Sequence, residues 1–137
     1  MEAAIVALIR GDAAIGALIG VSAAARIHPH IAPQGTTVPF LTYYKVSGDS
    51  TPVHSLSNRR ANLEWSRLTI EAWSQTYAQA KDIDDKVRIL LDGFSGVSAS
   101  LTLKSVKRIA TRDLFEPDAI PKPLYRVSSD YLINYPL

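Results

Sequence analysis

The segment RIHPHIAPQGTTVPFLTYYKVSG, residues 26–48, holds three of the eight prolines of the chain and then turns apolar and aromatic. Each proline fixes its own φ angle and pushes the preceding residue out of the helical region. Residues 21–39 are therefore expected to form an extended arm with several turns. Because Pro39 directly precedes the apolar, aromatic run, residues 40–46 are predicted to form a strand.

One helix, or a kinked pair of helices, is predicted before the arm. Residues 2–10 place apolar side chains at helical spacing, and a second helical stretch follows the N-cap candidate Asp12 and stops at Gly20. The apolar N-terminus carries Glu2 where a signal peptide has basic residues, and Arg10 interrupts it far short of the ~20 residues that span a bilayer. We therefore expect a soluble protein made in the cytoplasm, with no membrane partner.

Residues 61–74 alternate between two faces, which is the pattern of a strand with one core face. The core face is predicted to hold Leu68, Ile70 and Ala72. The opposite face carries Trp65, Arg67, Thr69, Glu71 and Trp73. Since aromatic residues beside an arginine are typical of interface cores, Trp65, Arg67 and Trp73 are predicted to lie at a subunit interface or under the arm.

A polar, turn-rich segment at residues 47–60 precedes this strand. It is too long for a tight hairpin, so we expect a projecting loop between two paired strands, and loops of this length tend to be functional or disordered. Arg59 and Arg60 close the loop and are candidates for contacts in assembly or for lining a DNA channel.

The clearest helix is predicted at residues 76–92, with Thr76 as its N-cap and Gly93 as its stop. Its solvated side is expected to hold ordinary ion pairs between side chains four residues apart. These pairs are Asp82 with Lys86 and Asp84 with Arg88.

The remaining sequence predicts strands at residues 98–110 and 124–135, separated by a loop at residues 111–123 that contains three prolines. The expected element order is therefore α-β-β-α-β-β. This order indicates an α+β fold, with a four-stranded, mostly antiparallel sheet and helices packed on one face. We expect a single domain over residues 1–137.

Within the predicted loop, an apolar pair is surrounded by carboxylates. Leu114 and Phe115 lie among Asp113, Glu116 and Asp118, and a buried loop could not easily satisfy those charges. We interpret the segment as a docking loop, with Leu114, Phe115 and Glu116 as interface candidates. The alternative is that Phe115 folds back onto the core of its own chain.

Catalytic and metal-binding patterns are missing from the sequence. There is no cysteine, so disulfides, thiolate catalysis and cysteine-based zinc sites are excluded. The histidines His28, His30 and His54 lack partners at metal-binding spacing, and no glycine-rich phosphate loop or Gly-x-Ser-x-Gly turn occurs. The formal net charge of +2 does not argue for nucleic-acid binding. We predict that the protein is not an enzyme and uses no cofactor and no metal.

Five segments of the chain carry a family resemblance. They are DAAIGALIG at residues 12–20, the pattern IHP…APQG…PF within residues 27–40, LTIEAWSQTYAQA at 68–80, VRILLDG at 87–93 and LYRVSSDY at 124–131. In this order they resemble the tail completion, or tail terminator, proteins of long-tailed phages and gene transfer agents. The sequence departs from the family pattern at residues 120–123, IPKP, which lengthen the loop before the last strand.

The resemblance implies a single tail-terminator-like domain that acts as a structural virion protein. Such proteins form a ring, commonly a hexamer, which ends the tail tube and joins it to the head connector. The implied partners are further copies of the chain, the tail tube protein and the head–tail connector proteins, with DNA passing non-specifically through the lumen. The implied location is the tail–neck junction of the virion, after assembly in the host cytoplasm. The alternative from a different class is a small monomeric adaptor or DNA-binding module.

Overall fold

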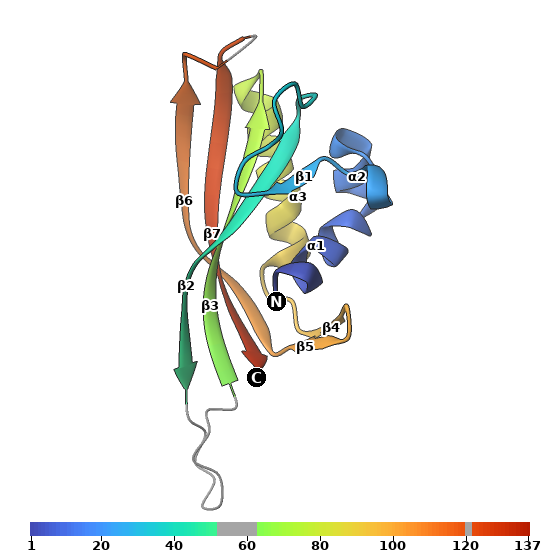
Figure 1. Ribbon diagram of the computed structural model, residues 1–137, viewed down its shortest axis with the longest axis vertical. Coiled ribbons are helices and arrows are strands. Elements are labelled where there is room, and N and C mark those ends of the chain that lie inside the picture. Colours follow the sequence, from blue (N-terminus) through green and yellow to red (C-terminus); the bar gives the residue numbers. More distant parts are fainter. Residues whose placement is uncertain (52–62, 120–121) are drawn as a thin grey trace, which may run out of the picture.

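A long, twisted sheet with helices against one face forms the fold (Figure 1). The computed structural model describes residues 1–51, 63–119 and 122–137. In chain order the elements are α1 (Glu2–Arg10), α2 (Ala13–Ile19), the 3-10 helix η1 (Ser22–Ala24), β1 (Ile27–Pro29), β2 (Phe40–Thr51), β3 (Leu63–Ser74), α3 (Tyr77–Leu91), β4 (Gly96–Ser98), β5 (Leu101–Leu103), β6 (Ser105–Glu116) and β7 (Leu124–Pro136). The α+β class predicted from the sequence is confirmed.

The main sheet differs from the predicted one. In the described residues it has five strands in the order β1-β2-β3-β7-β6, and it is mixed because β1 pairs in parallel with β2. The sequence predicts no strand in the arm, yet Ile27–Pro29 join the sheet edge as β1. The amide of Leu41 donates to the carbonyl of Arg26 over 2.9 Å, and the amide of His30 donates to the carbonyl of Tyr43 over 2.8 Å.

The predicted strand at residues 98–110 and the predicted loop at 111–123 are wrong in their boundaries. The first part is a small separate hairpin, β4–β5, which turns at Ala99 and Ser100. Both turn residues have positive φ angles, as a two-residue hairpin turn of the primed type requires. Strand β6 then continues to Glu116, through a bulge at Ile109 that shifts its register against β7.

Strand β2 is also longer than expected, because it pairs with β3 as far as Thr51. The first part of the predicted loop at residues 47–60 is therefore strand. Arg59 and Arg60 lie outside the described residues.

The helices begin and end where the sequence predicts. The Asp12 carboxylate accepts a hydrogen bond from the amide of Ile15 over 2.9 Å, and Thr76 Oγ1 accepts one from the amide of Gln79 over 3.3 Å. Both are N-caps, which satisfy backbone donors that a helix start leaves unpaired. No helix among residues 1–51, 63–119 and 122–137 is long and apolar enough to cross a membrane.

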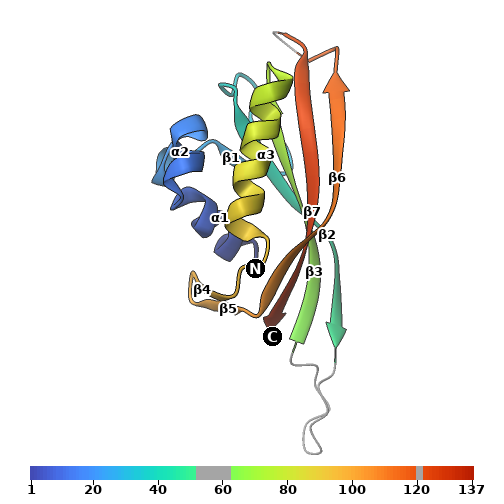
Figure 2. The same cartoon turned by 180° about the vertical axis from the view of Figure 1, so that it is seen from behind.

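The hydrophobic core lies between the helices and one face of the sheet. Figures 1 and 2 show from opposite sides that the helices lie against this one face. The helices supply Ile5, Ile9, Ile15, Ile19, Ile83, Val87 and Leu91, and the strands supply Leu41, Leu68, Ile70, Ala72, Tyr131 and Ile133. The predicted core face of β3 is thus confirmed. Arg26 ties the last residue of the arm to α2, because its Nε donates to the carbonyl of Pro39 over 2.9 Å and its Nη2 to that of Leu18 over 2.8 Å.

Candidate functional site

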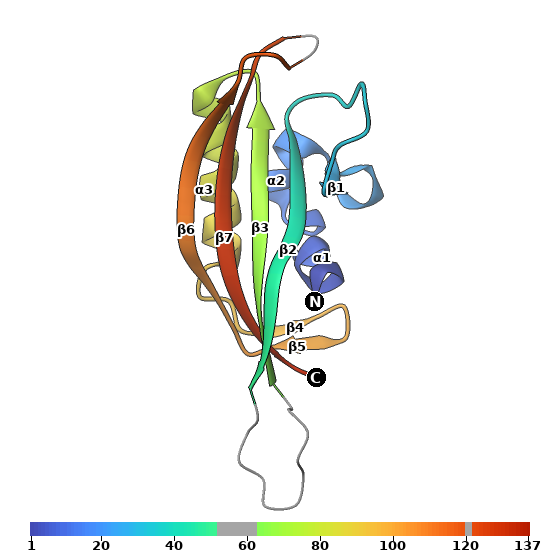
Figure 3. The same cartoon turned by 60° about the vertical axis from the view of Figure 1, so that its left-hand side comes forward.

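No helix of the described residues covers the opposite face of the sheet, which we call the open face (Figure 3). The registers of β2, β3, β7 and β6 align its side chains in cross-strand rows. From the arm end of the sheet the rows are Phe40, Trp73, Arg126 and Leu114; then Thr42, Glu71, Ser128 and Arg112; then Tyr44, Thr69, Asp130 and Ala110; then Ser47, Arg67, Leu132 and Lys107; and last Asp49, Trp65, Asn134 and Ser105. All three predicted interface residues of β3 therefore share this face.

Asp130 is the centre of a polar network on the open face. Its carboxylate is buried, with 2% of the residue exposed. Oδ1 accepts from Thr69 Oγ1 over 2.7 Å and Oδ2 accepts from Arg67 Nε over 3.0 Å, while Arg112 Nη1 lies 3.5 Å from Oδ2. Burial acts to raise the pKa of Asp130, but the bonds from Thr69 and Arg67 and the charge of Arg112 outweigh it. The pKa of Asp130 is consequently lowered from 3.8.

Arg126 joins a second buried carboxylate to the aromatic row. Its Nη1 lies 3.3 Å from Glu71 Oε2, and its Nη2 lies 2.8 Å from Glu116 Oε1 at the end of β6. Tyr44 OH also donates to Glu71, over 3.3 Å. The guanidinium carbon lies 5.0 Å from the centre of the Trp73 ring, which is a cation–π arrangement. One arginine thus bridges two acidic groups and lies over an indole.

The two tryptophans of the open face have different surroundings. Trp73 stacks on Phe40 with ring centres 5.7 Å apart, and its Nε1 donates to Thr42 Oγ1 over 3.0 Å. Trp65 lies at the other end of β3 and is 37% exposed. Trp73 is therefore held largely by its own chain, whereas Trp65 presents its ring to solvent.

The predicted docking loop is in fact the end of β6. Leu114 and Phe115 consequently point to opposite faces, with Leu114 on the open face and Phe115 on the helix side. Phe115 is 50% exposed and does not enter the core; its ring centre lies 4.9 Å from that of Tyr125. Tyr125 in turn meets Tyr77 of α3 edge-on at 5.9 Å. We call Tyr77, Phe115 and Tyr125 the aromatic knob.

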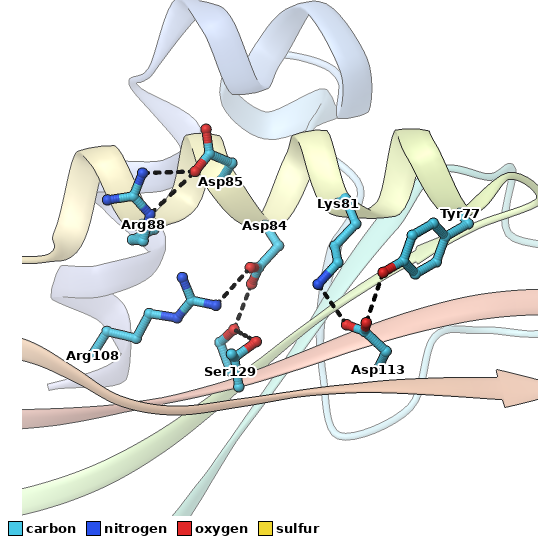
Figure 4. A network of polar contacts seen from close by, with 9 residues as sticks. Tyr77, Lys81, Asp84, Asp85, Arg88, Arg108, Asp113 and Ser129 are labelled. Carbon is cyan, nitrogen blue, oxygen red and sulfur yellow. Dashed lines mark hydrogen bonds and ion pairs between the residues drawn. The ribbon is translucent and has the colours of Figure 1, made fainter.

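Two of the carboxylates around the knob, Asp113 and Glu116, are already paired. Asp113 accepts from Lys81 Nζ and from Tyr77 OH, each over 2.8 Å, as Figure 4 shows. These bonds, with the one from Lys81 the stronger, hold the pKa of Asp113 below its usual value. Glu116 is occupied by Arg126. The sequence indicated the acidic surroundings of Phe115 but not these partners, which lie on α3 and β7.

A polar network under α3 was missed at the sequence level. Asp84 is buried. Its carboxylate accepts hydrogen bonds from Ser129 Oγ over 2.5 Å and from Arg108 Nη2 over 3.0 Å (Figure 4). The predicted pair of Asp84 with Arg88 is therefore wrong, and Arg88 binds Asp85 over 2.7 Å. The other predicted pair, Asp82 with Lys86, is present at 2.6 Å.

The arm crosses the edge of the open face and leaves a hollow beneath it. One part, of about 450 Å³, is lined by residues 32–38 together with Phe40, Gln75 and Leu124. The adjoining part, of about 360 Å³, is lined by His30, Ile31, Ala32, Phe40, Thr42, Tyr44, Glu71, Trp73 and Arg126. Ala32 and Phe40 border both parts. We call the combined hollow the arm groove.

These groups suit a contact surface. Aromatic rings, arginines and neutralised carboxylates gather on the open face and beside the arm. In the described part of the chain, no three His, Cys, Asp or Glu side chains are placed to hold a metal ion.

The family model of the tail completion protein gp17 matches residues 3–135, and the chain belongs to this family. The resemblance read from five sequence segments is thereby confirmed. Among solved structures, a chain from the "Virion of native gene transfer agent (GTA) particle" superposes with a TM-score of 0.72 at 16% identity, over 100% of this chain and 95% of that one. At this identity the likeness shows a shared fold. No curated protein matches the sequence.

Proposed function

We propose that the protein is a structural component of the virion that forms a ring, ends the tail tube and joins it to the head connector. The match of the tail completion family to residues 3–135 carries this proposal. The solved relative in fold belongs to a gene transfer agent virion and has almost the same length, since 95% of it is covered. The ring is a hexamer, located at the tail–neck junction after assembly in the host cytoplasm.

The chemistry of the open face supports a role in assembly. Covering a charged surface is costly when its charges must first lose water. On the open face Asp130 and Glu71 are already buried by arginines of their own chain, so much of that cost is met during folding. A neighbouring subunit then covers a preorganised layer, with Trp65 and Leu114 as its apolar contacts and Arg67 and Glu116 at their sides.

The proposed mechanism is geometric and not catalytic. One face of the ring fits the last ring of the tail tube, the other fits the connector, and the lumen passes DNA without reading its sequence. The competing function is a monomeric adaptor or DNA-binding module, whose mass in solution is that of one chain.

Native mass measurement of the purified protein, alone and with tail tubes that lack it, tests the proposal. We expect a species several times the 15.0 kDa of one chain, and electron micrographs with one additional ring at the tube end. Heads added afterwards should join only capped tubes. A chain that stays monomeric with and without tubes, and does not bind their ends, overturns the proposal. A shift of DNA by the monomer at physiological salt supports the competing module instead.

A further inference from the structure

We infer that the ring closes by insertion of the aromatic knob of one protomer into the arm groove of the next. This inference rests on the proposed ring and names two surfaces that meet in it at the arm end of the sheet, in addition to the covered open face. The occupant of the groove is a second copy of this chain.

The two surfaces lie on opposite edges of the sheet. The strand order β1-β2-β3-β7-β6 places the knob on the β6 edge and the arm on the β1 edge. A ring needs such a head-to-tail contact, in which two different surfaces of each protomer face its two neighbours. A contact of one surface with its own copy would end at a dimer.

The two surfaces also lie at the same level along the strands. Phe115 pairs with Tyr125, and Tyr125 pairs with Ser74, the residue after Trp73. Trp73 pairs with Phe40 on the floor of the groove. The knob, on the helix side, and the groove floor, on the open face, are therefore one residue apart along the sheet. Neighbours related by a rotation about an axis along the strands hold these two surfaces at nearly the same level, and they meet where the β6 edge of one protomer overlaps the arm edge of the next. Figure 3 shows β6 along one side of the sheet and the arm at the other side.

The exposed groups at both edges are complementary in kind. The knob presents Phe115 and Tyr77, both exposed, to solvent. The groove offers Phe40 and Trp73 as a floor and has Ile31 at its rim, 83% exposed. Clusters of solvent-exposed apolar side chains are characteristic of interfaces. Aromatic side chains that fill a pocket of the partner carry much of the binding energy.

The charges at both edges favour this contact as well. Asp113 beside the knob is neutralised by Lys81, and Glu71 in the groove is neutralised by Arg126. Bringing the knob into the groove therefore joins two apolar surfaces whose neighbouring acids already have partners. A nucleic acid is a poor occupant by the same reasoning, because the groove holds a carboxylate and an arginine that is already bound to two acids.

Two charge variants test the contact, one for each surface. Phe115→Asp alters the knob and Ile31→Asp alters the rim of the groove. We expect each to raise the protein concentration needed for ring formation at least tenfold, without loss of the folded protomer in thermal unfolding. Val97→Asp is the matched control, because Val97 is also exposed but lies on the β4–β5 hairpin away from both surfaces. It should assemble as the unaltered chain does.

Mixing the two variants gives the sharper result. The intact knob of Ile31→Asp fits the intact groove of Phe115→Asp, so an equimolar mixture should give a heterodimer and no ring. The chain has no cysteine, so a doubly substituted Ile31→Cys, Phe115→Cys chain treated with a short bis-maleimide should give a covalent ladder that ends at the ring size.

Rings formed at the normal concentration by both charge variants overturn the contact, as does a mixture that yields no heterodimer. Either result leaves the proposed ring intact, provided that the unaltered chain still assembles. An unaltered chain that remains monomeric overturns both proposals together.

Discussion

Arg67 on β3 donates from its Nε to Oδ2 of Asp130 on β7 over 3.0 Å, and so covers a carboxylate that is almost completely buried. The bond joins residues 63 positions apart in the chain. Thr69 and Arg112 approach the same carboxylate, so three strands of the sheet meet at one acidic group. This site is the best-defined polar feature of the open face.

Replacing Asp130 by asparagine keeps the shape of the side chain and removes its charge. Hydrogen bonds to charged groups contribute about 1.5–3 kcal/mol to stability, so we expect Asp130→Asn to lower the free energy of unfolding by about that amount. Urea denaturation of the protomer measures the change. Asp82→Asn is the control, since it breaks an exposed pair on α3 worth about 0.3–0.5 kcal/mol. Equal losses of unfolding free energy in Asp130→Asn and Asp82→Asn contradict the stabilising role of the buried Asp130 carboxylate.

The stabilisation by Asp130 should also depend on pH. Because its folded pKa is lowered from 3.8, the contribution is present in full above that unfolded value and is lost as pH falls through the folded pKa. The difference in unfolding free energy between the unaltered chain and Asp130→Asn should therefore be constant from pH 7 to about pH 5. It should shrink at pH values below 3.8. If this difference in unfolding free energy instead grows as the pH falls, the result contradicts a lowered pKa of Asp130.

Asp84 under α3 should behave as a buried network residue and not as part of a solvated helix face. Asp84→Asn leaves Arg108 without its charged partner and weakens the bond from Ser129, so we expect a loss of about 2 kcal/mol. Chemical denaturation again provides the measurement. Asp82 lies half a turn earlier on the same helix and pairs with Lys86 in solvent, so Asp82→Asn should cost much less. Equal losses of unfolding free energy in Asp84→Asn and Asp82→Asn contradict the buried network around Asp84.

The two indoles of the open face can be followed separately by their fluorescence. Trp73→Phe leaves Trp65, which is exposed, and Trp65→Phe leaves Trp73, which lies between Phe40 and Arg126. In the protomer we expect acrylamide to quench Trp65 several times more efficiently than Trp73. On ring formation the quenching of Trp65 should fall toward that of Trp73, because the open face becomes covered. Unchanged quenching of Trp65 in the assembled ring argues against the open face as an interface.

Local patterns in the sequence were sufficient to predict the helices and the shared face of β3. Periodicity of apolar residues and the caps Asp12 and Thr76 depend on neighbours a few positions away, and both are seen in the structure. Alternation likewise placed Trp65, Arg67 and Trp73 together. The partners of these residues could not be predicted in the same way, because Asp130 and Arg126 reach them only through pairing of β3 with β7.

The errors have definite physical causes. The β4–β5 turn uses Ala99 and Ser100 at positive φ angles, where glycine or asparagine gives the usual signal. The bulge at Ile109 inverts the alternation of inward and outward side chains along β6. The second half of β6 therefore does not continue the pattern of its first half, and the sequence does not predict it as strand. Asp84 had a possible partner four residues away in Arg88, and only the packing of α3 on β6 and β7 selects Arg108 and Ser129.

The two phenylalanines at the arm end of the sheet should separate folding from assembly. Phe40 is 7% exposed and stacks on Trp73, so Phe40→Ser should cost about 3–5 kcal/mol, the loss typical of a buried phenylalanine. Phe115 is half exposed, and Phe115→Ser should cost the protomer only about 1–2 kcal/mol, since about half of its surface is already in water. Urea denaturation gives both values, and native mass measurement of the same samples reports assembly. We expect Phe115→Ser to keep a stable protomer with weakened ring formation. A loss as large as that of Phe40→Ser, with normal assembly, places Phe115 in the core and removes it from the interface.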